Sequence, residues 1–191
     1  MKGFLEITFG PMFSGKTTDL IQKVHQYLDI NEAKGILKTA LIINSSLDKR
    51  DINKYNILTS HSSVKKEIKD SIECITTSLL REVDPKDFDY IAIDESQFFK
   101  DLVPVVKDWL QLGKKIHCVG LIADVNKKRF GELLDLIPEA SKINQLKAYC
   151  ILCKDHLQNA PFTKLKKSTG EKSVFFVGEK DYYIPVCHEH Y

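Results

Sequence analysis

The sequence predicts an α/β fold, in which a mostly parallel β-sheet carries helices on both faces and a small metal-binding domain follows the sheet. Three observations predict this fold. Short apolar runs alternate with helical patterns as far as residue 148. A glycine-rich loop connects the first predicted strand to the first predicted helix. From Tyr149 onward the chain is rich in loops and carries two close pairs of cysteine and histidine residues. We therefore expect two domains, residues 1–148 and 149–191.

The predicted strands are short apolar runs, and two predicted helices have apolar stripes. Strands are expected at residues 5–9, 39–43, 72–75, 88–93, 116–121 and 143–148. A helix over residues 15–29 presents one apolar stripe, formed by Leu20, Ile21, Val24 and Leu28. A second helix begins after Asp101, whose side chain is expected to cap it, and its apolar face consists of Leu102, Val105, Val106 and Trp109. Because strands alternate with helices, we expect right-handed connections between parallel strands.

Composition excludes several classes of protein. The 28 basic residues against 26 acidic ones give a net charge of +2, too little for a DNA-packing protein or a polybasic membrane binder. No apolar run approaches the roughly 18 residues of a membrane-spanning helix, and the early Glu6 argues against a signal peptide. Five cysteines in such a chain favour reduced thiols or a metal site over disulfides. We expect a cytosolic or nuclear protein, with cytoplasmic as our prediction, and neither a membrane nor a nucleic-acid partner.

The glycine-rich loop fits the pattern G-x-x-x-x-G-K-[ST], in the strand–loop–helix context that the pattern requires. It consists of Gly10, Pro11, Met12, Phe13, Ser14, Gly15, Lys16 and Thr17, and Thr18 continues it into the helix. In such a loop, backbone N–H groups and the helix dipole bind phosphate oxygens. Lys16 can then reach the β- and γ-phosphates of ATP, and the Thr17 hydroxyl can ligate Mg²⁺. The motif predicts a P-loop NTPase-type sheet; the alternative is a chance match in a turn.

Two carboxylates directly follow the predicted strand 88–93. In parallel sheets, ligands bind at the carboxyl ends of the strands. Asp94 is therefore placed to hold Mg²⁺, and Glu95 to accept a proton from an attacking hydroxyl or water. The alternative is that the pair only caps a helix, a common role for acidic residues. Beside a phosphate loop, we favour the catalytic interpretation.

Two pairs of potential metal ligands lie in the last 43 residues. Cys150 and Cys153 form the first pair, and Cys187 and His190 the second, each with two residues between its members. Together they can complete a tetrahedral Cys₃His site, for which Zn²⁺ fits best. Because four protein ligands leave no open position, we expect a structural zinc. His188 and His156 remain rivals for the fourth position, and unligated thiols remain the alternative to a metal site.

Several segments together resemble the type II thymidine kinases, the zinc-containing P-loop kinases of the cytosol. The segments are residues 10–18 (Gly-Pro-Met-Phe-Ser-Gly-Lys-Thr-Thr), 94–99 (Asp-Glu-Ser-Gln-Phe-Phe), 48–50, 120–124, 130–131 and the cysteine-bearing end. The resemblance covers nearly the whole chain, and the order and spacing of the segments make it specific. One departure is Val125, which stands where relatives often carry an aromatic residue.

The resemblance implies a reaction and roles for individual residues. The family transfers the γ-phosphoryl group of ATP to the 5′-hydroxyl of thymidine or deoxyuridine. By resemblance Glu95 is the general base, Lys16 and Arg50 stabilise the transferring phosphate, and Thr17 and Asp94 serve Mg²⁺. The resemblance also implies substrate-binding positions: Met12, Asp48, Gln97, Phe98, Leu121, Phe130, Thr163, Val174, Phe176, Gly178 and Tyr183. It further implies a lasso-like loop at about residues 158–172 that holds the base, and a homotetramer.

Two other functions compete with this interpretation. One is a P-loop ATPase whose zinc domain binds nucleic acid or a protein, although a helicase would need two such domains and the lasso lacks interleaved aromatic and basic residues. The other is a kinase for a nucleotide. Such enzymes usually close an arginine-rich lid over the phosphates, and this chain has only three arginines.

Overall fold

The computed structural model describes residues 3–48, 71–154, 159–166 and 182–191. Its centre is a six-stranded sheet in the order β3-β2-β4-β5-β1-β6, with every neighbouring pair parallel. The strands are β1 (Phe4–Phe9), β2 (Ala40–Ser45), β3 (Ile72–Thr77), β4 (Tyr90–Ile93), β5 (Lys115–Gly120) and β6 (Lys142–Gln145). A separate antiparallel pair consists of β7 (Phe162–Leu165) and β8 (Tyr183–Val186).

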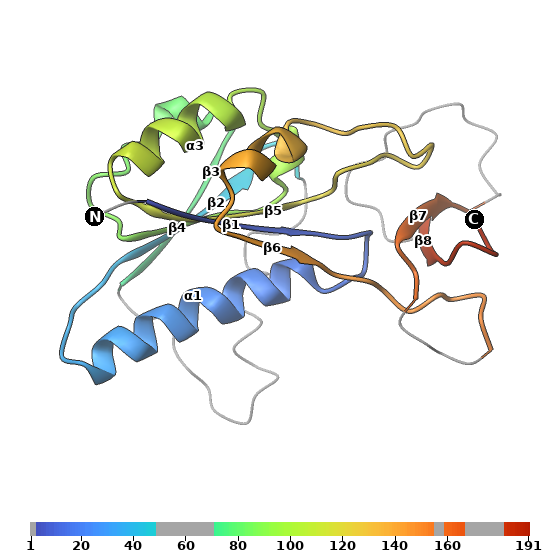
Figure 1. Ribbon diagram of the computed structural model, residues 1–191, viewed down its shortest axis with the longest axis horizontal. Coiled ribbons are helices and arrows are strands. Elements are labelled where there is room, and N and C mark those ends of the chain that lie inside the picture. Colours follow the sequence, from blue (N-terminus) through green and yellow to red (C-terminus); the bar gives the residue numbers. More distant parts are fainter. Residues whose placement is uncertain (1–2, 49–70, 155–158, 167–181) are drawn as a thin grey trace.

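Helices cover both faces of the large sheet. The long helix α1 (Lys16–Ala33) lies on one face, and α3 (Leu102–Gln111) lies on the other with the 3₁₀ helix η3 (Leu133–Glu139) (Figure 1). Two further 3₁₀ helices, η1 (Leu80–Glu82) and η2 (Ser96–Phe98), occupy connections on either side of β4. No helix in the described ranges has the length and apolar character needed to cross a membrane.

Two hydrophobic cores result from these layers. On the α3 face, buried side chains of the central strands pack against Leu102, Val106 and Trp109. On the α1 face, Leu20 and Val24 pack against Tyr90 and its neighbours. Burying apolar area contributes about 25 cal/mol per Å², so these two cores are the main source of stability for the layered fold.

The predicted fold class is confirmed, with differences in detail. The last strand, β6, ends at Gln145 instead of residue 148, and β4 begins at Tyr90 instead of residue 88. The first helix continues to Ala33, about one turn beyond the predicted end at residue 29. The predicted capping role of the Asp101 side chain is wrong, because this carboxylate makes no capping hydrogen bond to α3. Instead it accepts hydrogen bonds from the backbone N–H groups of Leu80 and Arg81, at 3.2 and 3.0 Å. The buried Asp101 thus anchors η1 to the start of α3.

A buried polar network lies between α1 and the sheet. Lys23 of α1 forms ion pairs with Glu6 of β1, at 2.7 Å, and with Asp19, at 2.6 Å. The Thr8 hydroxyl lies 2.9 Å from Nε2 of the fully buried His117 on β5. Glu6 and Thr8 are two residues apart on one strand and therefore point to the same face. The network fixes α1, and with it the loop that precedes α1, against the sheet.

A small C-terminal module stands beyond the carboxyl ends of the strands (Figure 1). We call the described residues 148–154, 159–166 and 182–191 the Cys/His module. Its own core contains Ala148, Ala160 and Val186 together with the buried thiols of Cys150 and Cys187. Ala148 and Ala160 exchange backbone hydrogen bonds, at 3.0 and 3.1 Å, which close the module at the point where the chain enters it.

Candidate active site and metal centre

The phosphate loop leaves the carboxyl end of β1 and enters α1. Phe13 and Gly15 both adopt left-handed backbone conformations, with φ of 65° and 84°. The Pro11 carbonyl accepts hydrogen bonds from the Lys16 ammonium, at 2.7 Å, and from the Ser14 hydroxyl, at 2.9 Å. Lys16 is only 8% exposed, so its charge is held inside the loop rather than extended into solvent. This is the arrangement of a loop that surrounds phosphate oxygens with N–H groups and one ammonium.

The loop meets the end of β4 through a direct hydrogen bond. The Thr17 hydroxyl, in the first turn of α1, donates to Oδ2 of Asp94 at 2.9 Å. Asp94 is 1% exposed, and its Oδ1 accepts the backbone N–H of Glu95 at 3.0 Å. A hydroxyl and a carboxylate side by side next to a phosphate loop provide hard oxygen ligands of the kind that Mg²⁺ prefers. The two residues predicted to serve Mg²⁺ therefore lie together.

Glu95 lies on a tight turn between β4 and η2. Its backbone is left-handed, with φ 50° and ψ 39°, an uncommon conformation for a residue with a Cβ. Its side chain forms no cap for η2. Instead, Oε2 of Glu95 accepts a hydrogen bond from Nε2 of Gln97 at 2.6 Å. The alternative, in which the acidic pair only caps a helix, is therefore wrong for Glu95, because its carboxylate binds Gln97 instead.

Other predicted substrate residues surround the same edge of the sheet. Asp48, after β2, is buried and accepts a hydrogen bond from Asn44 at 3.3 Å. Phe98 and Phe130 pack edge to face, with ring centroids 5.5 Å apart. Leu121 follows β5, Thr163 lies on β7, and the buried Tyr183 begins β8. Outside the described residues lie Arg50, Val174, Phe176 and Gly178, together with His156 and the part of the predicted lasso at residue 158 and residues 167–172.

A contact between the phosphate loop and the Cys/His module was not expected from the sequence. The backbone N–H of Met12 donates to the Thr163 hydroxyl at 3.0 Å. The resemblance marks both residues as substrate-binding, but it gives no sign that they bind each other. The contact means that β7 of the module helps to fix the backbone of the phosphate loop.

A second contact joins the module to the loop after β5. The Lys127 ammonium lies 4.0 Å from the ring centroid of Phe162 and 3.5 Å from that of Tyr191. The Tyr191 hydroxyl donates to the Val125 carbonyl at 2.6 Å. Cation–π contacts of this kind are worth about 0.5–1 kcal/mol each at exposed sites. Among the described residues, these contacts attach the module to the phosphate loop and to the loop that follows β5.

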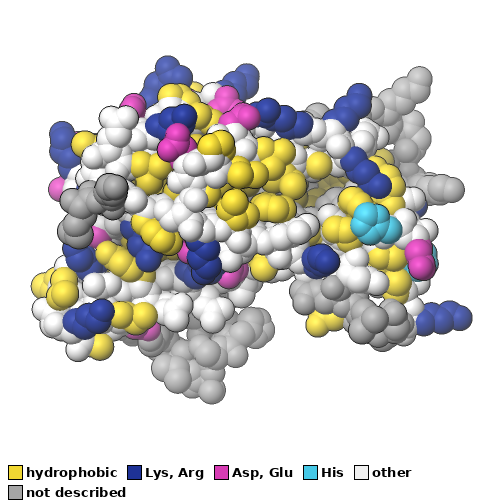
Figure 2. All heavy atoms as spheres, viewed as in Figure 1, with side chains coloured by type: hydrophobic (Ala, Val, Ile, Leu, Met, Phe, Trp, Pro, Cys, Tyr) yellow, Lys and Arg dark blue, Asp and Glu magenta, His cyan; other side chains and the backbone are white. Residues whose placement is uncertain are grey.

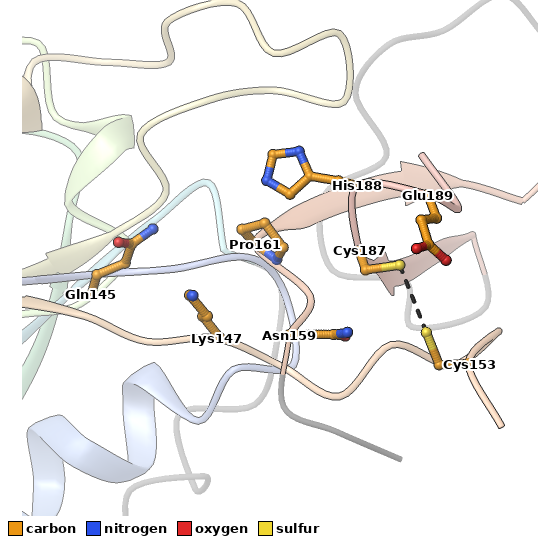
Figure 3. A pocket seen from close by; sticks show the side chains of 8 residues that line it. All are labelled: Gln145, Lys147, Cys153, Asn159, Pro161, Cys187, His188 and Glu189. Atoms are coloured by element: carbon orange, nitrogen blue, oxygen red, sulfur yellow. Dashed lines mark hydrogen bonds between the residues drawn. The ribbon is translucent and has the colours of Figure 1, made fainter. Parts of the chain in front are cut away.

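Between the sheet and the module lies an open cavity of about 420 Å³. Figure 3 shows Gln145 and Lys147 on the side of the sheet and Cys187, His188 and Glu189 on the side of the module. The lining is mixed in polarity, and two of the predicted metal ligands contribute to it. The cavity therefore lies between the end of β6 and two residues of the metal cluster, Cys153 and Cys187.

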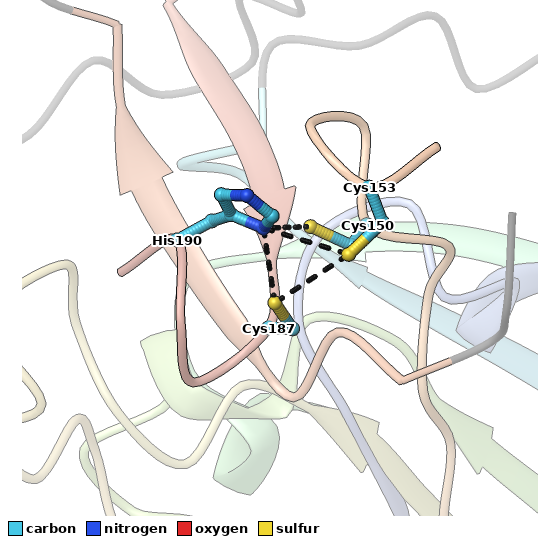
Figure 4. A group of neighbouring side chains, drawn as sticks. All are labelled: Cys150, Cys153, Cys187 and His190. Carbon is cyan, nitrogen blue, oxygen red and sulfur yellow. Dashed lines mark hydrogen bonds between the residues drawn. The ribbon is translucent and has the colours of Figure 1, made fainter. Parts of the chain in front are cut away.

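The four predicted metal ligands converge in the module, and their ligand atoms all lie within 4.8 Å of one another (Figure 4). The His190 Nδ1 atom is 3.5 Å from the sulfurs of Cys150 and Cys153 and 3.2 Å from that of Cys187. The sulfurs of Cys153 and Cys187 are 3.7 Å apart. Zinc bonds of roughly 2.3 Å to sulfur and 2.0–2.1 Å to nitrogen imply S–S and S–N separations of about 3.8 and 3.5 Å in a tetrahedron. The cluster is compatible with zinc.

Of the rival ligands, His188 lies outside the cluster. Its ring packs edge to face on Phe162, with centroids 4.7 Å apart.

The neighbouring Cys150 and Cys153 thiols influence each other's pKa. Burial alone raises the pKa of Cys150, but backbone N–H groups of Cys187 and Leu152 outweigh burial and lower this pKa to about 6. Burial and the neighbouring Cys150 and Cys187 thiols raise the pKa of Cys153 to about 12. At neutral pH the Cys153 thiol therefore becomes a thiolate beside Cys150 only when a cation offsets the repulsion between the two sulfurs.

Comparison with known proteins shows which family this chain resembles. The family model described as thymidine kinase matches residues 3–191. The chain is 37% identical to the thymidine kinase of Choristoneura biennis entomopoxvirus, over 96% of this chain and 93% of that protein. It is 34% identical to the thymidine kinase of Amsacta moorei entomopoxvirus, over 96% and 94% of the two chains. A cytosolic thymidine kinase of Bos taurus is 29% identical over 97% of this chain and 71% of its own length. The chain belongs to the thymidine kinase family.

Proposed function

We propose that this protein transfers the γ-phosphoryl group of ATP to the 5′-hydroxyl of thymidine, and of deoxyuridine. Membership of the family supports the reaction. The observation that carries the proposal is the meeting of three groups at one edge of the sheet. Lys16 in its loop, the Thr17–Asp94 pair and the Glu95 carboxylate provide a phosphate site, a metal site and a base on adjoining elements.

Each group has one task in this reaction. The 5′-oxygen forms a bond to the γ-phosphorus, the bond from that phosphorus to the β,γ-bridging oxygen breaks, and ADP leaves. Glu95 accepts the proton of the 5′-hydroxyl, a step worth roughly 10²–10⁴-fold in rate. Lys16 offsets charge that develops on the phosphate oxygens. Thr17 and Asp94 would hold Mg²⁺, which neutralises charge on the β- and γ-phosphates of bound ATP.

Other parts of the proposal rest on the resemblance. Arg50 would supply a guanidinium to the transferring phosphate. Val174, Phe176 and Gly178, with the lasso at about residues 158–172, would hold the base. We also propose that residues 1–148 form the ATP-binding domain and 149–191 the zinc domain. Cysteine and histidine donors at tetrahedral spacing support Zn²⁺ as the resident ion, with a structural role.

We propose a homotetramer in the cytoplasm. Light scattering coupled to size exclusion should give four times the 21.9 kDa mass of one chain, and a monomer or dimer mass would contradict the tetramer. Imaging of the tagged protein in its host cell tests the location. Exclusion of the protein from the cytoplasm would contradict it.

An acceptor panel separates this function from its rivals. The protein is incubated with Mg-ATP and thymidine, deoxycytidine, thymidylate or single-stranded DNA, and ADP release is recorded. We expect only thymidine to drive release and thymidine monophosphate to appear with it. Release driven by DNA would favour the ATPase alternative, and release driven by thymidylate a nucleotide kinase. Among the described residues on the face shown in Figure 2, acidic and basic side chains are interspersed and form no continuous basic surface, which favours the small-molecule kinase.

A further inference from the structure

Gln97 lies between the proposed base and the end of strand β5. Its side chain is 3% exposed. The amide nitrogen, Nε2, donates to Oε2 of Glu95 at 2.6 Å, and the amide oxygen, Oε1, accepts the backbone N–H of Leu121 at 2.9 Å. A backbone N–H can only donate, so this second bond determines which end of the amide carries the oxygen. The nitrogen must therefore face the Glu95 carboxylate.

Two glycines lie close to Gln97, where a larger residue would collide with it. A Cβ on Gly120 would overlap with Oε1 of Gln97, and a Cβ on Gly131 would overlap with its backbone carbonyl. Gly131 also has a φ of 68°, which disfavours any other residue. The Ser96 hydroxyl, one residue before Gln97, donates to the Val119 carbonyl at 2.9 Å and ties η2 to β5. Gln97 therefore lies in close contact with the segments around Gly120 and Gly131, and the Ser96–Val119 hydrogen bond keeps η2 beside β5.

We propose that Gln97 is a positioning residue that sets the rotation of the Glu95 carboxylate toward the nucleoside hydroxyl. This inference rests on the proposed role of Glu95 as the base. Glu95 is buried on a left-handed turn, and the short hydrogen bond from the buried Gln97 amide constrains the rotation of its carboxylate. Proton transfer depends on the direction of the accepting oxygen, so loss of the constraint lowers the rate more than it lowers substrate binding.

The alternative is a structural role, in which Gln97 only satisfies the buried N–H of Leu121. Two variants separate the roles. Gln97→Met keeps the volume of the side chain and removes both hydrogen bonds. Gln97→Glu is isosteric, can still accept from Leu121, and replaces the donor to Glu95 with a second carboxylate. Gln111→Met and Gln111→Glu, at the exposed far end of α3, are matched controls.

The assay measures kcat and KM for thymidine from pH 5 to 9, with the melting temperature of each variant. For Gln97→Met we expect kcat to fall roughly ten- to hundredfold, a part of the base contribution, while KM changes less than about threefold. For Gln97→Glu the acid limb of the kcat profile should move to higher pH by about one unit or more, because two adjacent carboxylates share a proton. The controls should match the wild type.

Three results would overturn the inference. One is a kcat within twofold of the controls in both folded variants, with an unchanged pH profile. Another is a rise in KM that accounts for the whole loss of activity. The third is failure of both variants to fold, which would assign Gln97 to the fold. Glu95→Gln, measured in parallel, separates this inference from the proposed function: if Glu95→Gln turns over like the wild type, Glu95 is not the base at all.

Discussion

Charging of His117 should make the sheet domain lose stability in acid. This imidazole is fully buried under α1, and its Nε2 contacts the Thr8 hydroxyl. Burial and the nearby Lys23 lower the pKa of His117 from 6.5 to about 4. Carboxylates facing it act in the opposite direction: Glu6, Asp19 and Asp94. The folded protein therefore resists protonation at a pH where the unfolded chain accepts it.

The sign and size of the effect follow from linkage. Above pH 6.5 the imidazole is neutral in both states and its contribution to stability is complete. As the pH falls from 6.5 toward 4, His117 becomes protonated in the unfolded chain but stays neutral in the folded protein. The free energy of unfolding therefore falls by about 1.4 kcal/mol per pH unit. Between pH 7.5 and 5.0 the loss from His117 alone amounts to about 2 kcal/mol.

Urea unfolding of the wild type and of His117→Gln at these two pH values measures the effect. Glutamine stays neutral and can keep a hydrogen bond to Thr8. The single tryptophan, Trp109, lies in the core of the sheet domain and reports its unfolding separately from acid release of a metal by the module. We expect the wild type to lose about 2 kcal/mol more than the variant. Equal losses in the two proteins would refute the assignment of this acid sensitivity to His117.

Four further predictions concern the site and the module. Lys16→Ala should keep the fold and lower turnover by roughly 10²–10³-fold, because alanine cannot offset phosphate charge; near-normal turnover would contradict its role. Cys187→Ser should lower both the zinc content, which elemental analysis should give as about one ion per chain in the wild type, and the melting temperature. A variant with full zinc content would show that the cluster is not the zinc site. Thr163→Val should raise KM for ATP, because the Met12 N–H loses its partner, whereas an effect on thymidine alone would assign Thr163 to the nucleoside pocket. Val125→Phe should tighten thymidine binding by up to roughly tenfold by stacking, whereas a lower melting temperature with no gain in affinity would mark Val125 as a packing residue.

The fold could be predicted because its signals are local. The apolar runs of the sheet and the G-x-x-x-x-G-K-[ST] loop each specify an element within a few residues, and all six strands appear in the structure. The spacing within the Cys150/Cys153 pair and within the Cys187/His190 pair also predicts a metal knuckle locally, and in the structure the two pairs lie together. The domain boundary at Tyr149 stays a prediction.

Contacts between distant segments could not be predicted in the same way. Asp101 has the residue type and position of a helix cap, but tertiary packing brings the η1 backbone within reach and its N–H groups take the carboxylate. The resemblance marks Gln97 and Thr163 as substrate residues, yet their partners, Glu95 and Met12, depend on how the loops pack. The type of a hydrogen-bonding residue does not indicate which distant residue it binds, so one sequence alone does not predict such pairs.

In the mechanism we propose, Glu95 removes the proton from the 5′-hydroxyl of thymidine at the carboxyl edge of the sheet. The most direct measurement combines thymidine affinity and turnover for Glu95→Gln, with affinity determined by calorimetry. Glutamine keeps the shape and loses the base, so we expect the thymidine dissociation constant to stay within about threefold while kcat falls by roughly 10²–10⁴-fold. A variant that loses thymidine affinity while keeping its turnover would exclude Glu95 as the base.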